Sequence, residues 1–373
     1  MKKNIAASVS VIFFLFLFFG ANPAQAEVEH KILFKKVLEF SDDSEDFFFK
    51  YPDNPYNRQM QVDCKGNIYI LDANRILKFD SSGRFIKNLM SHGQGPGEVT
   101  RLRNFILRND KIYIYNHYPD KIIIKDKKGA LVKEFRTTES LDKFFAVYAK
   151  NYYSFNEELL DLTINYAKII DVDWYLIRVS SKGKIETVKD CKLPIKSFIV
   201  KKGRNISEIR IAKILVAQLK DKTFFVTHST EYEVKLLDIK KKKVVKTFKR
   251  DYQRQEPPPE VAKKLNIQAF GFLGKVYRRP PQKYLNDIQQ LLVHGDNLWV
   301  ATSTVDEKKG VLIDIFNKDC EFSGSFYLKL SDRLGYLDYF SFHAYIFDSF
   351  LYTIESDKDD NPRVVKYEII TAE

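Results

Sequence analysis

The sequence has few cysteines, and none of them is spaced for metal or haem binding. Its 373 residues include only three, Cys64, Cys191 and Cys320, which lie far apart without a C-x-x-C or Cys/His pattern. The histidines show no i, i+4 pair either. A zinc or haem motif is therefore excluded, whereas one disulfide with one free thiol is left open, because the pattern does not select a pair.

The sequence also lacks the common catalytic signatures. It has no G-x-S-x-G nucleophile elbow, and no Ser/His/Asp or Cys/His set can be identified from residue order. The glycine-rich segment 93–98 lacks the lysine and the following Ser or Thr of a P-loop, and no helical pattern starts there. We interpret this segment as a tight connection rather than a phosphate-binding loop.

The hydrophobic run at the N-terminus is too short to span a membrane. Lys2 and Lys3 precede the apolar run 11–19, which is followed by the small-x-small site Ala24-Gln25-Ala26. This order is typical of a secretory signal peptide covering residues 1–26. No cysteine follows the cleavage site to carry a lipid anchor. We therefore expect an exported, soluble protein in the periplasm or outside the cell, with no transmembrane span after cleavage.

The charge is basic, with 61 Lys and Arg against 49 Asp and Glu and a formal net charge of +12. A basic balance raises affinity for polyanions, but an exported protein meets anionic lipids and envelope polysaccharide rather than DNA. We expect no nucleic-acid partner. The lysine run 240–243 lies between two strand-like stretches, where a hairpin turn would expose it to solvent.

An internal repeat runs through the chain. Residues 66–86 read GNIYILDANRILKFDSSGRFI, and residues 110–132 read DKIYIYNHYPDKIIIKDKKGALV. Each unit predicts a strand, a polar link, a second strand, a tight turn and a third strand, with Gly83 and Gly129 supplying the positive φ of the turn. The six units align on these aromatic residues: Tyr69, Tyr113, Tyr153, Phe224, Trp299 and Tyr352.

The repeat predicts an all-β, six-bladed β-propeller formed by residues 27–373 as a single domain. The shorter repeat spacings match blades of about 40 to 50 residues, and no long helical pattern separates the units. The last unit ends after its third strand, while the strand-like segment 30–40 precedes the first unit without a partner. We expect this N-terminal strand to complete the last blade and close the ring.

Two stretches do not fit the repeat, at about 191–219 and 251–287. The second contains the triproline 257–259 and a short helical pattern at 260–267. Long insertions in a repeat array tend to lie on one face, which is often the binding face.

The segment 62–83, VDCKGNIYILDANRILKFDSSG, resembles the repeat of NHL-type propellers, with a D-x-x-G-N-[IV]-Y-[IV] opening and an N-R-[IV]-x-[KV]-[FY]-D close. Together with Gly93-Gln-Gly-Pro-Gly-Glu98, it makes the chain similar to exported bacterial six-bladed propeller families of undefined function that are related to NHL and TolB-like proteins. This resemblance implies a binding platform and brings no catalytic motif with it.

The second insertion supplies a candidate binding site. Lys275, Arg278 and Arg279, with Tyr277 between them, have the chemistry to bind a carboxylate, a phosphate or a sulfated sugar. The alternative interpretation is a solvated loop packed on the ring by Phe270, Phe272 and Leu273.

A metal site is the second candidate. Enzymatic six-bladed propellers, such as lactonase-like and amidating-lyase-like proteins, hold a metal with side chains from several inner strands. By that resemblance Asp72, Asn116, His117 and His228 would converge on a divalent metal such as calcium, since each follows the first recognisable strand of its unit. Polar residues after strands also start turns, which is the alternative.

We therefore expect a non-enzymatic binding or scaffold module, monomeric and without a cofactor. One propeller face would recognise an envelope or extracellular protein, a peptide or an anionic glycan. The alternative is a metal-dependent hydrolase or lyase with its site in the central channel. A structural role in a larger envelope assembly is a third hypothesis, which would require an exposed apolar patch on the ring.

Overall fold

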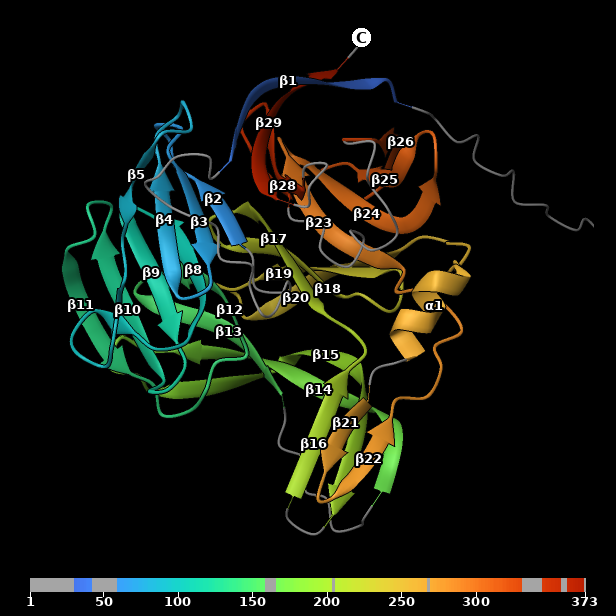
Figure 1. Ribbon diagram of the computed structural model, residues 1–373, viewed down its shortest axis with the longest axis horizontal. Helices are drawn as coiled ribbons and strands as arrows, with labels where there is room; N and C mark the ends of the chain where they lie inside the picture. Colours follow the sequence, from blue (N-terminus) through green and yellow to red (C-terminus); the bar gives the residue numbers. More distant parts are fainter. Residues whose placement is uncertain are drawn as a thin grey trace, which may run out of the picture.

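The computed structural model describes residues 30–41, 59–157, 166–202, 205–266, 269–330, 344–356 and 361–371. In these ranges six antiparallel sheets of four or five strands surround one axis (Figure 1). This arrangement confirms the six-bladed propeller predicted from the repeat. The predicted signal peptide, residues 1–26, lies outside the described residues.

Each sheet is one blade, and its strands are given from the innermost to the outermost. Blade one contains β2 (Gln59–Val62), β3 (Ile68–Asp72), β4 (Arg75–Phe79) and β5 (Phe85–Asn88). Blade two contains β8 (Leu102–Arg108), β9 (Lys111–Asn116), β10 (Lys121–Asp126) and β11 (Leu131–Arg136). Blade three contains β12 (Lys143–Tyr148), β13 (Asn151–Glu157), β14 (Tyr166–Val179), β15 (Ile185–Lys202) and β16 (Asn205–Arg210).

The second half of the chain forms the other three blades. Blade four contains β17 (Ile214–Lys220), β18 (Thr223–His228), β19 (Glu233–Asp238) and β20 (Lys243–Lys249). Blade five contains β23 (Ile288–His294), β24 (Asn297–Asp306), β25 (Gly310–Phe316) and β26 (Phe322–Leu328). Blade six contains β27 (Ala344–Phe347), β28 (Phe350–Ser356), β29 (Pro362–Thr371) and β1 (Ile32–Ser41). Outside the blades are β6 (Ser91–His92), β7 (Glu98–Val99), α1 (Pro259–Asn266), β21 (Ala269–Phe272) and β22 (Lys275–Arg278).

The aromatic strand of each sequence unit is the second strand of its blade. Tyr69, Trp299 and Tyr352 are fully buried in the hydrophobic clusters between blades. Stacked sheets bury large flat side chains well, which explains the aromatic content of the chain. An innermost strand precedes the aromatic strand in every blade, and it carries neither the aromatic residue nor the turn glycine by which the repeat is recognised.

The turn before the outermost strand explains the repeated D-x-x-G pattern. In blade one the carboxylate of Asp80 accepts a hydrogen bond of 2.9 Å from the backbone N–H of Ser82, and Gly83 has a φ of 83°. Glycine adopts this left-handed conformation without steric cost. Blades four and five lack the glycine, and there Lys242 (φ 54°) and Cys320 (φ 60°) take the left-handed conformation instead.

The ring is closed by its own N-terminal strand, as predicted. Strand β1 pairs antiparallel with β29 along its length, beginning with Ile32 opposite Thr371. The ring of Phe34 packs with its centroid 5.9 Å from that of Phe326 and 6.3 Å from that of Trp299, so β1 also contacts the core of blade five. Closure leaves β29 without a free edge.

Amide side chains join neighbouring innermost strands around the axis. The Nε2 of Gln61 donates to the carbonyl of Phe105 at 3.0 Å, and its Oε1 accepts from the N–H of Leu107 at 2.7 Å. Asn104 and Gln290 donate in the same way to backbone carbonyls of β12 and β27. These bonds satisfy backbone groups that the antiparallel ladders of the blades leave unpaired at the inner edge.

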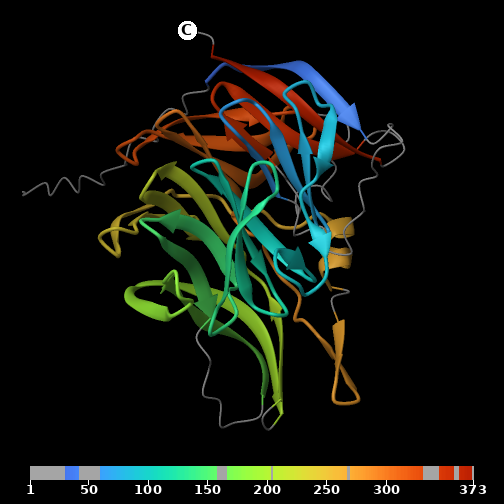
Figure 2. The same cartoon turned by 90° about the vertical axis from the view of Figure 1, so that its left-hand side faces the viewer.

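Blade three extends away from the ring. Its strands β14 and β15 continue beyond Glu157, the last residue of β13, and β16 pairs with the far half of β15. We call residues 166–173, 194–202 and 205–210, together with the β21–β22 hairpin, the projection. The hairpin runs beside these strands in both views (Figures 1 and 2), and its Phe272 and Tyr277 pack against Phe198 and Val200 of β15.

The two predicted insertions meet in this projection. Residues 191–219 contain the end of β15, β16 and most of β17, so they lengthen blade three and then supply the innermost strand of blade four. The boundary differs from the prediction because β15 is one continuous hydrogen-bonded strand from the ring into the projection. Residues 251–287 contain α1, close to the helix expected at 260–267, and the hairpin.

Two further expectations concern the membrane and the cysteines. Within the described ranges no helix has the length and apolar character needed to cross a bilayer. All three cysteines are free thiols, with Cys64 exposed and Cys191 and Cys320 buried. The disulfide that the sequence left open is therefore not formed in this structure.

Candidate functional site

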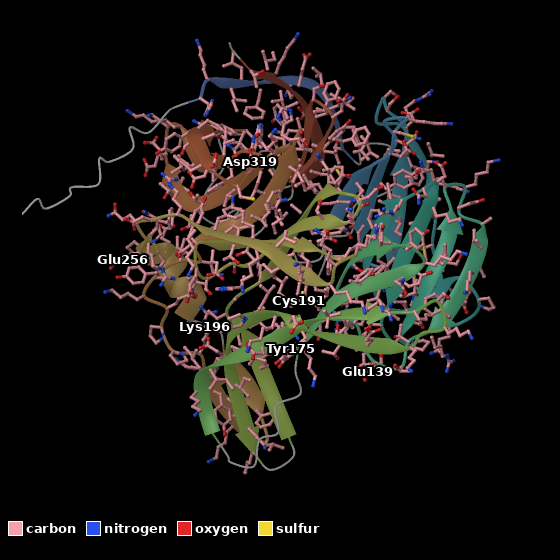
Figure 3. All side chains as sticks on the ribbon, turned by 180° about the vertical axis from the view of Figure 1, so that it is seen from behind. Glu139, Tyr175, Cys191, Lys196, Glu256 and Asp319 are labelled. Atoms are coloured by element: carbon pink, nitrogen blue, oxygen red, sulfur yellow. The ribbon has the colours of Figure 1, made fainter. Side chains whose placement is uncertain are left out.

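The long connections of the propeller lie on one face, which we call the loop face. It is the face on which the innermost strand of each blade begins and the second strand ends, as the register of Leu102 with Asn116 shows for blade two. The insertion 251–287 joins blades four and five there, and the projection leaves the ring from the same side of blade three. Lys196 lies near the base of the projection (Figure 3).

The predicted metal-site residues all lie at this face, but each has a local partner. Asn116 is fully buried, and its Oδ1 accepts hydrogen bonds from the N–H groups of Thr100 (2.9 Å) and Arg101 (3.0 Å). It thus holds the connection that arrives from blade one. Asn156 holds the next connection in a similar way: its Oδ1 accepts from the N–H of Asp142 at 3.2 Å, and its Nδ2 donates to the carbonyl of Ser140 at 2.6 Å. Such a polar residue after the second strand is a structural cap.

The other three predicted ligands belong to separate contacts. Asp72 forms an ion pair with Arg75, and the Nδ1 of His117 lies 2.8 Å from Asp120. His228 lies 3.0 Å from the hydroxyl of Thr230, and burial lowers the pKa of His228. In the part of the chain that the structure describes, no three His, Cys, Asp or Glu side chains form a metal-binding group. The four residues therefore do not converge.

The four residues of the predicted basic site on the hairpin do not form one surface. Tyr277 faces the projection and packs against Phe272, with ring centroids 6.3 Å apart. Arg279 is buried and donates a hydrogen bond to Gln282, whereas Lys275 and Arg278 are exposed. Strand alternation separates Tyr277 from Arg278, because successive side chains point to opposite faces of a hairpin.

The amides of the glycine-rich segment 93–98 are already occupied. The N–H of Gly95 donates to the carboxylate of Glu98 at 2.9 Å, and the N–H of Gly97 donates to Glu134 at 2.8 Å. Protein carboxylates thus take the positions that a bound phosphate would need. The interpretation as a tight connection agrees with this geometry.

An unexpected charge cluster lies at the base of the projection. The guanidinium of Arg210 contacts Glu157 (3.2 Å), Glu208 (3.2 Å) and Asp142 (3.4 Å), and its centre lies 4.4 Å from the ring centroid of Trp174. Four different segments of blade three supply these side chains. The cation–π contact with Trp174 restrains the guanidinium, whose donors contact the three carboxylates.

Burial and the neighbouring carboxylate of Glu208 perturb the ionisation of Glu157. Burial raises the pKa of Glu157 to about 7, and the charge of Glu208 and a hydrogen bond with it act in the same direction against the opposing effect of Arg210. A carboxyl group that exchanges its proton near neutral pH is a recurrent feature of functional sites.

Next to this cluster, cationic side chains gather around the axis at the loop face. Lys143 is the first residue of β12, and Lys213 directly precedes β17. Burial lowers the pKa of Lys143, and burial together with the charge of Lys143 lowers the pKa of Lys213 to about 8. In the described ranges the ammonium group of Lys143 has neither a carboxylate partner nor a hydrogen-bond acceptor.

Sequence reasoning missed these residues for an identifiable reason. Lys143, Lys213 and Arg210 lie at the ends of strands that the repeat does not mark, and the three acids around Arg210 are spread over 67 residues of sequence between Asp142 and Glu208. The available signal was Lys143 itself, a charged residue directly before the apolar run 144–147.

A cavity of about 140 Å³ lies on the other side of the ring, at the closure between blades five and six. His30, His294 and Trp299 contribute to its lining. Ligand sites usually have volumes of about 300–1,000 Å³. This cavity therefore has room for a few water molecules and does not compete with the loop face as a candidate site.

Comparisons with solved structures support the fold. A "Putative exported protein" from Bacteroides fragilis is 13% identical, with a TM-score of 0.52, over 93% of this chain and 97% of that chain. A member of the duf4221 family from Bacteroides vulgatus is 11% identical, with a TM-score of 0.58, over 92% of this chain and 100% of that chain. At these identities the likeness concerns the fold alone.

Comparisons of sequence identify the family. No curated protein matches this chain. A family model, DUF5128, described as a 6-bladed beta-propeller, matches residues 59–267, which is more than half of the chain. With the six sheets and the N-terminal closing strand in place, the chain belongs to the DUF5128 family of six-bladed β-propellers.

Proposed function

We propose that the protein is an exported, non-enzymatic binding module that holds a carboxylate-bearing peptide or glycan at its loop face. Lys143 carries this proposal. An ammonium group that is largely enclosed by protein and has no counter-charge is costly, because burial removes its hydration. An anionic group of a ligand would remove that cost, and it would do so only in the bound state.

The neighbours of Lys143 extend the same chemistry. Lys213 adds a second positive charge beside it, and Arg103 lies near the start of the adjacent innermost strand β8. The carboxylates around Arg210 supply acceptors for the hydroxyl or amide groups of a ligand whose acidic group contacts Lys143. A peptide with acidic side chains and a glycan with uronic acids share this combination of groups.

The alternative, a metal-dependent hydrolase or lyase, requires several ligands in one place. Asp72, Asn116, His117 and His228 are each engaged with local partners. Binding is therefore the function that the described side chains support better. The signal peptide, the monomeric state and the kinship with NHL and TolB-like propellers belong to the same proposal, and the repeat at 62–83 supports that kinship.

The test uses residues 27–373 with a polyglutamate peptide and a galacturonic acid oligosaccharide as probes in calorimetric titrations. We expect at least one probe to bind, and Lys143→Met to weaken that binding about tenfold or more. Binding should also decline as the pH rises through about 8, because Lys213 then loses its proton. The same variant should melt at a higher temperature than the wild type, since it removes an enclosed unpaired charge.

Lys240→Met is the matched control, because Lys240 is exposed in the turn before β20. It should leave both the affinity and the melting temperature unchanged. Equal affinity of Lys143→Met and the wild type, or no binding of either probe, would overturn the proposal. Stoichiometric metal in the purified protein, with a lower melting temperature in chelator, would favour the hydrolase or lyase.

A further inference from the structure

The turn of the β21–β22 hairpin contains a leucine in an unfavourable place. Phe272 pairs with Lys275, which leaves a two-residue turn of Leu273 (φ 48°) and Gly274 (φ 76°). Turns with two residues at positive φ favour Asn-Gly or Asp-Gly, because asparagine and aspartate tolerate the left-handed conformation and suit solvent. Leu273 meets neither requirement, since it is 50% exposed. Strain and exposure together indicate a function for this apolar side chain.

A second apolar side chain is exposed on the same hairpin. Val276 is 72% exposed, because strand alternation directs Phe272 and Tyr277 toward the projection and Val276 away from it. Ile169 of β14 is 41% exposed on the neighbouring strands. The hairpin turn and the outer ends of these strands point in the same direction in Figures 1 and 2. The end of the projection therefore presents apolar side chains to solvent.

Among the described residues, the charge at this end has one sign. The segments 166–170, 199–207 and 269–278 contain no Asp or Glu. Four of their basic residues are exposed, namely Lys168, Lys202, Lys275 and Arg278. Elsewhere on the projection acidic residues do occur, as with the ion pair of Lys196 and Asp171 nearer its base. Within the described strands and hairpin, the acids of the projection thus lie toward its base, and its outer end presents cations.

We propose that the end of the projection binds the surface of an anionic lipid bilayer. Leu273 and Val276 would enter the boundary between headgroups and acyl chains, and the four cations would contact lipid phosphates. A protein partner fits less well, because a stable protein interface needs about 800 Å² from each partner and the tip of a two-stranded hairpin offers only a few apolar side chains. A bilayer accepts single side chains and has no fixed shape to match.

The test measures flotation of residues 27–373, which omit the apolar N-terminal run, with vesicles of phosphatidylcholine alone or mixed with phosphatidylglycerol. We expect binding to the anionic vesicles, weakened by added salt. Leu273→Asn should reduce it about tenfold. Asparagine suits the left-handed turn, so this variant should fold at least as well as the wild type, and lost binding would not reflect unfolding. Lys275→Gln with Arg278→Gln should also reduce binding to anionic vesicles.

Val132→Thr is the matched control for Val276→Thr, because Val132 of β11 is 49% exposed on a different blade. The proposal predicts a loss for Val276→Thr and none for Val132→Thr. Unchanged binding of Leu273→Asn, equal binding to neutral and anionic vesicles, or no binding would overturn it. The inference is independent of the loop face: Lys143→Met should still bind vesicles, and Leu273→Asn should still bind the carboxylate probes.

Discussion

At the base of the projection, burial first and the charge of Glu208 second, against the opposing effect of Arg210, determine how Glu157 responds to pH. Its pKa in the folded protein is about 7, compared with an ordinary value of 4.5. Between these two values the unfolded chain releases the proton while the folded protein retains it. Stability therefore falls as the pH rises from about 4.5 to about 7, and this contribution is constant above that window.

Glu157→Gln should remove this pH dependence. The wild type should lose about 1–2 kcal/mol more of its unfolding free energy than the variant between pH 4.5 and 7, after allowance for solvent screening at a half-buried group. Urea unfolding at a series of pH values measures this difference. Glu256→Gln, at an exposed position on the outside of the ring (Figure 3), should follow the wild type. Parallel wild-type and Glu157→Gln curves would contradict the assignment.

The roles of single residues were harder to predict from the sequence than the strands or the fold. Asn116 and His117 have the chemistry of ligands, yet their partners are a backbone connection and Asp120. The sequence shows which hydrogen-bond donor or acceptor a residue carries, but not whether the folded protein supplies a partner for it. Lys143 is the opposite case, because its significance depends on the lack of a partner among the described residues. Only the three-dimensional arrangement of the neighbouring groups distinguishes these situations.

At the scale of elements, β1 is the strand on which closure depends. Phe34→Ala removes the ring that contacts Trp299 and Phe326, and it should lower the unfolding free energy by about 2–3 kcal/mol, because the side chain is only partly buried. Thermal and denaturant unfolding measure the effect.

Leu33→Ala, on the solvent side of the same strand, provides the comparison for Phe34→Ala. Leu33 is 50% exposed, so this change should alter stability by less than about 0.5 kcal/mol. Similar losses for both variants would mean that strand pairing alone, and not the packing of Phe34, holds β1 in place.

Strands bounded by clear turn motifs were predicted well. The D-x-x-G turns and the aromatic alternation identify the outer three strands of the first two blades, and the unpaired segment 30–40 identifies the closing strand. The innermost strands carry neither a turn glycine nor the aromatic residue of the repeat. The backbone groups at their inner edges are hydrogen-bonded by side chains of neighbouring blades, such as Gln61 and Asn104, and the sequence does not show these contacts. The length of β14 and β15 was also missed, because strand propensity does not show where a hairpin leaves its sheet.

At the scale of the whole molecule, the ring has no structurally privileged starting point. A circular permutant tests this: a short glycine linker joins Thr371 to Ile32, which are paired neighbours, and new termini open between Lys240 and Lys241. Blade four would then be closed by an outermost strand from the other end of the chain, as blade six is now. We expect a cooperative thermal transition within a few degrees of the wild type and an unchanged circular dichroism spectrum.

A permutant that fails to unfold cooperatively would contradict this expectation. It would show that blade six, with β1 and its contacts to blade five, has a role in folding that blade four cannot take over. A variant with the same linker but with termini opened inside the buried strand β24 serves as the negative control, since it disrupts a blade core.

The closing strand also imposes an order in time. Ribosomes extend a chain by about 5–20 residues per second, and more than 300 residues separate β1 (Ile32–Ser41) from its partner β29 (Pro362–Thr371). The β1 segment therefore waits on the order of tens of seconds without its ladder. Any chain cut short before residue 362 would keep an unsealed ring, so premature termination yields molecules that a protease or chaperone can distinguish from finished ones.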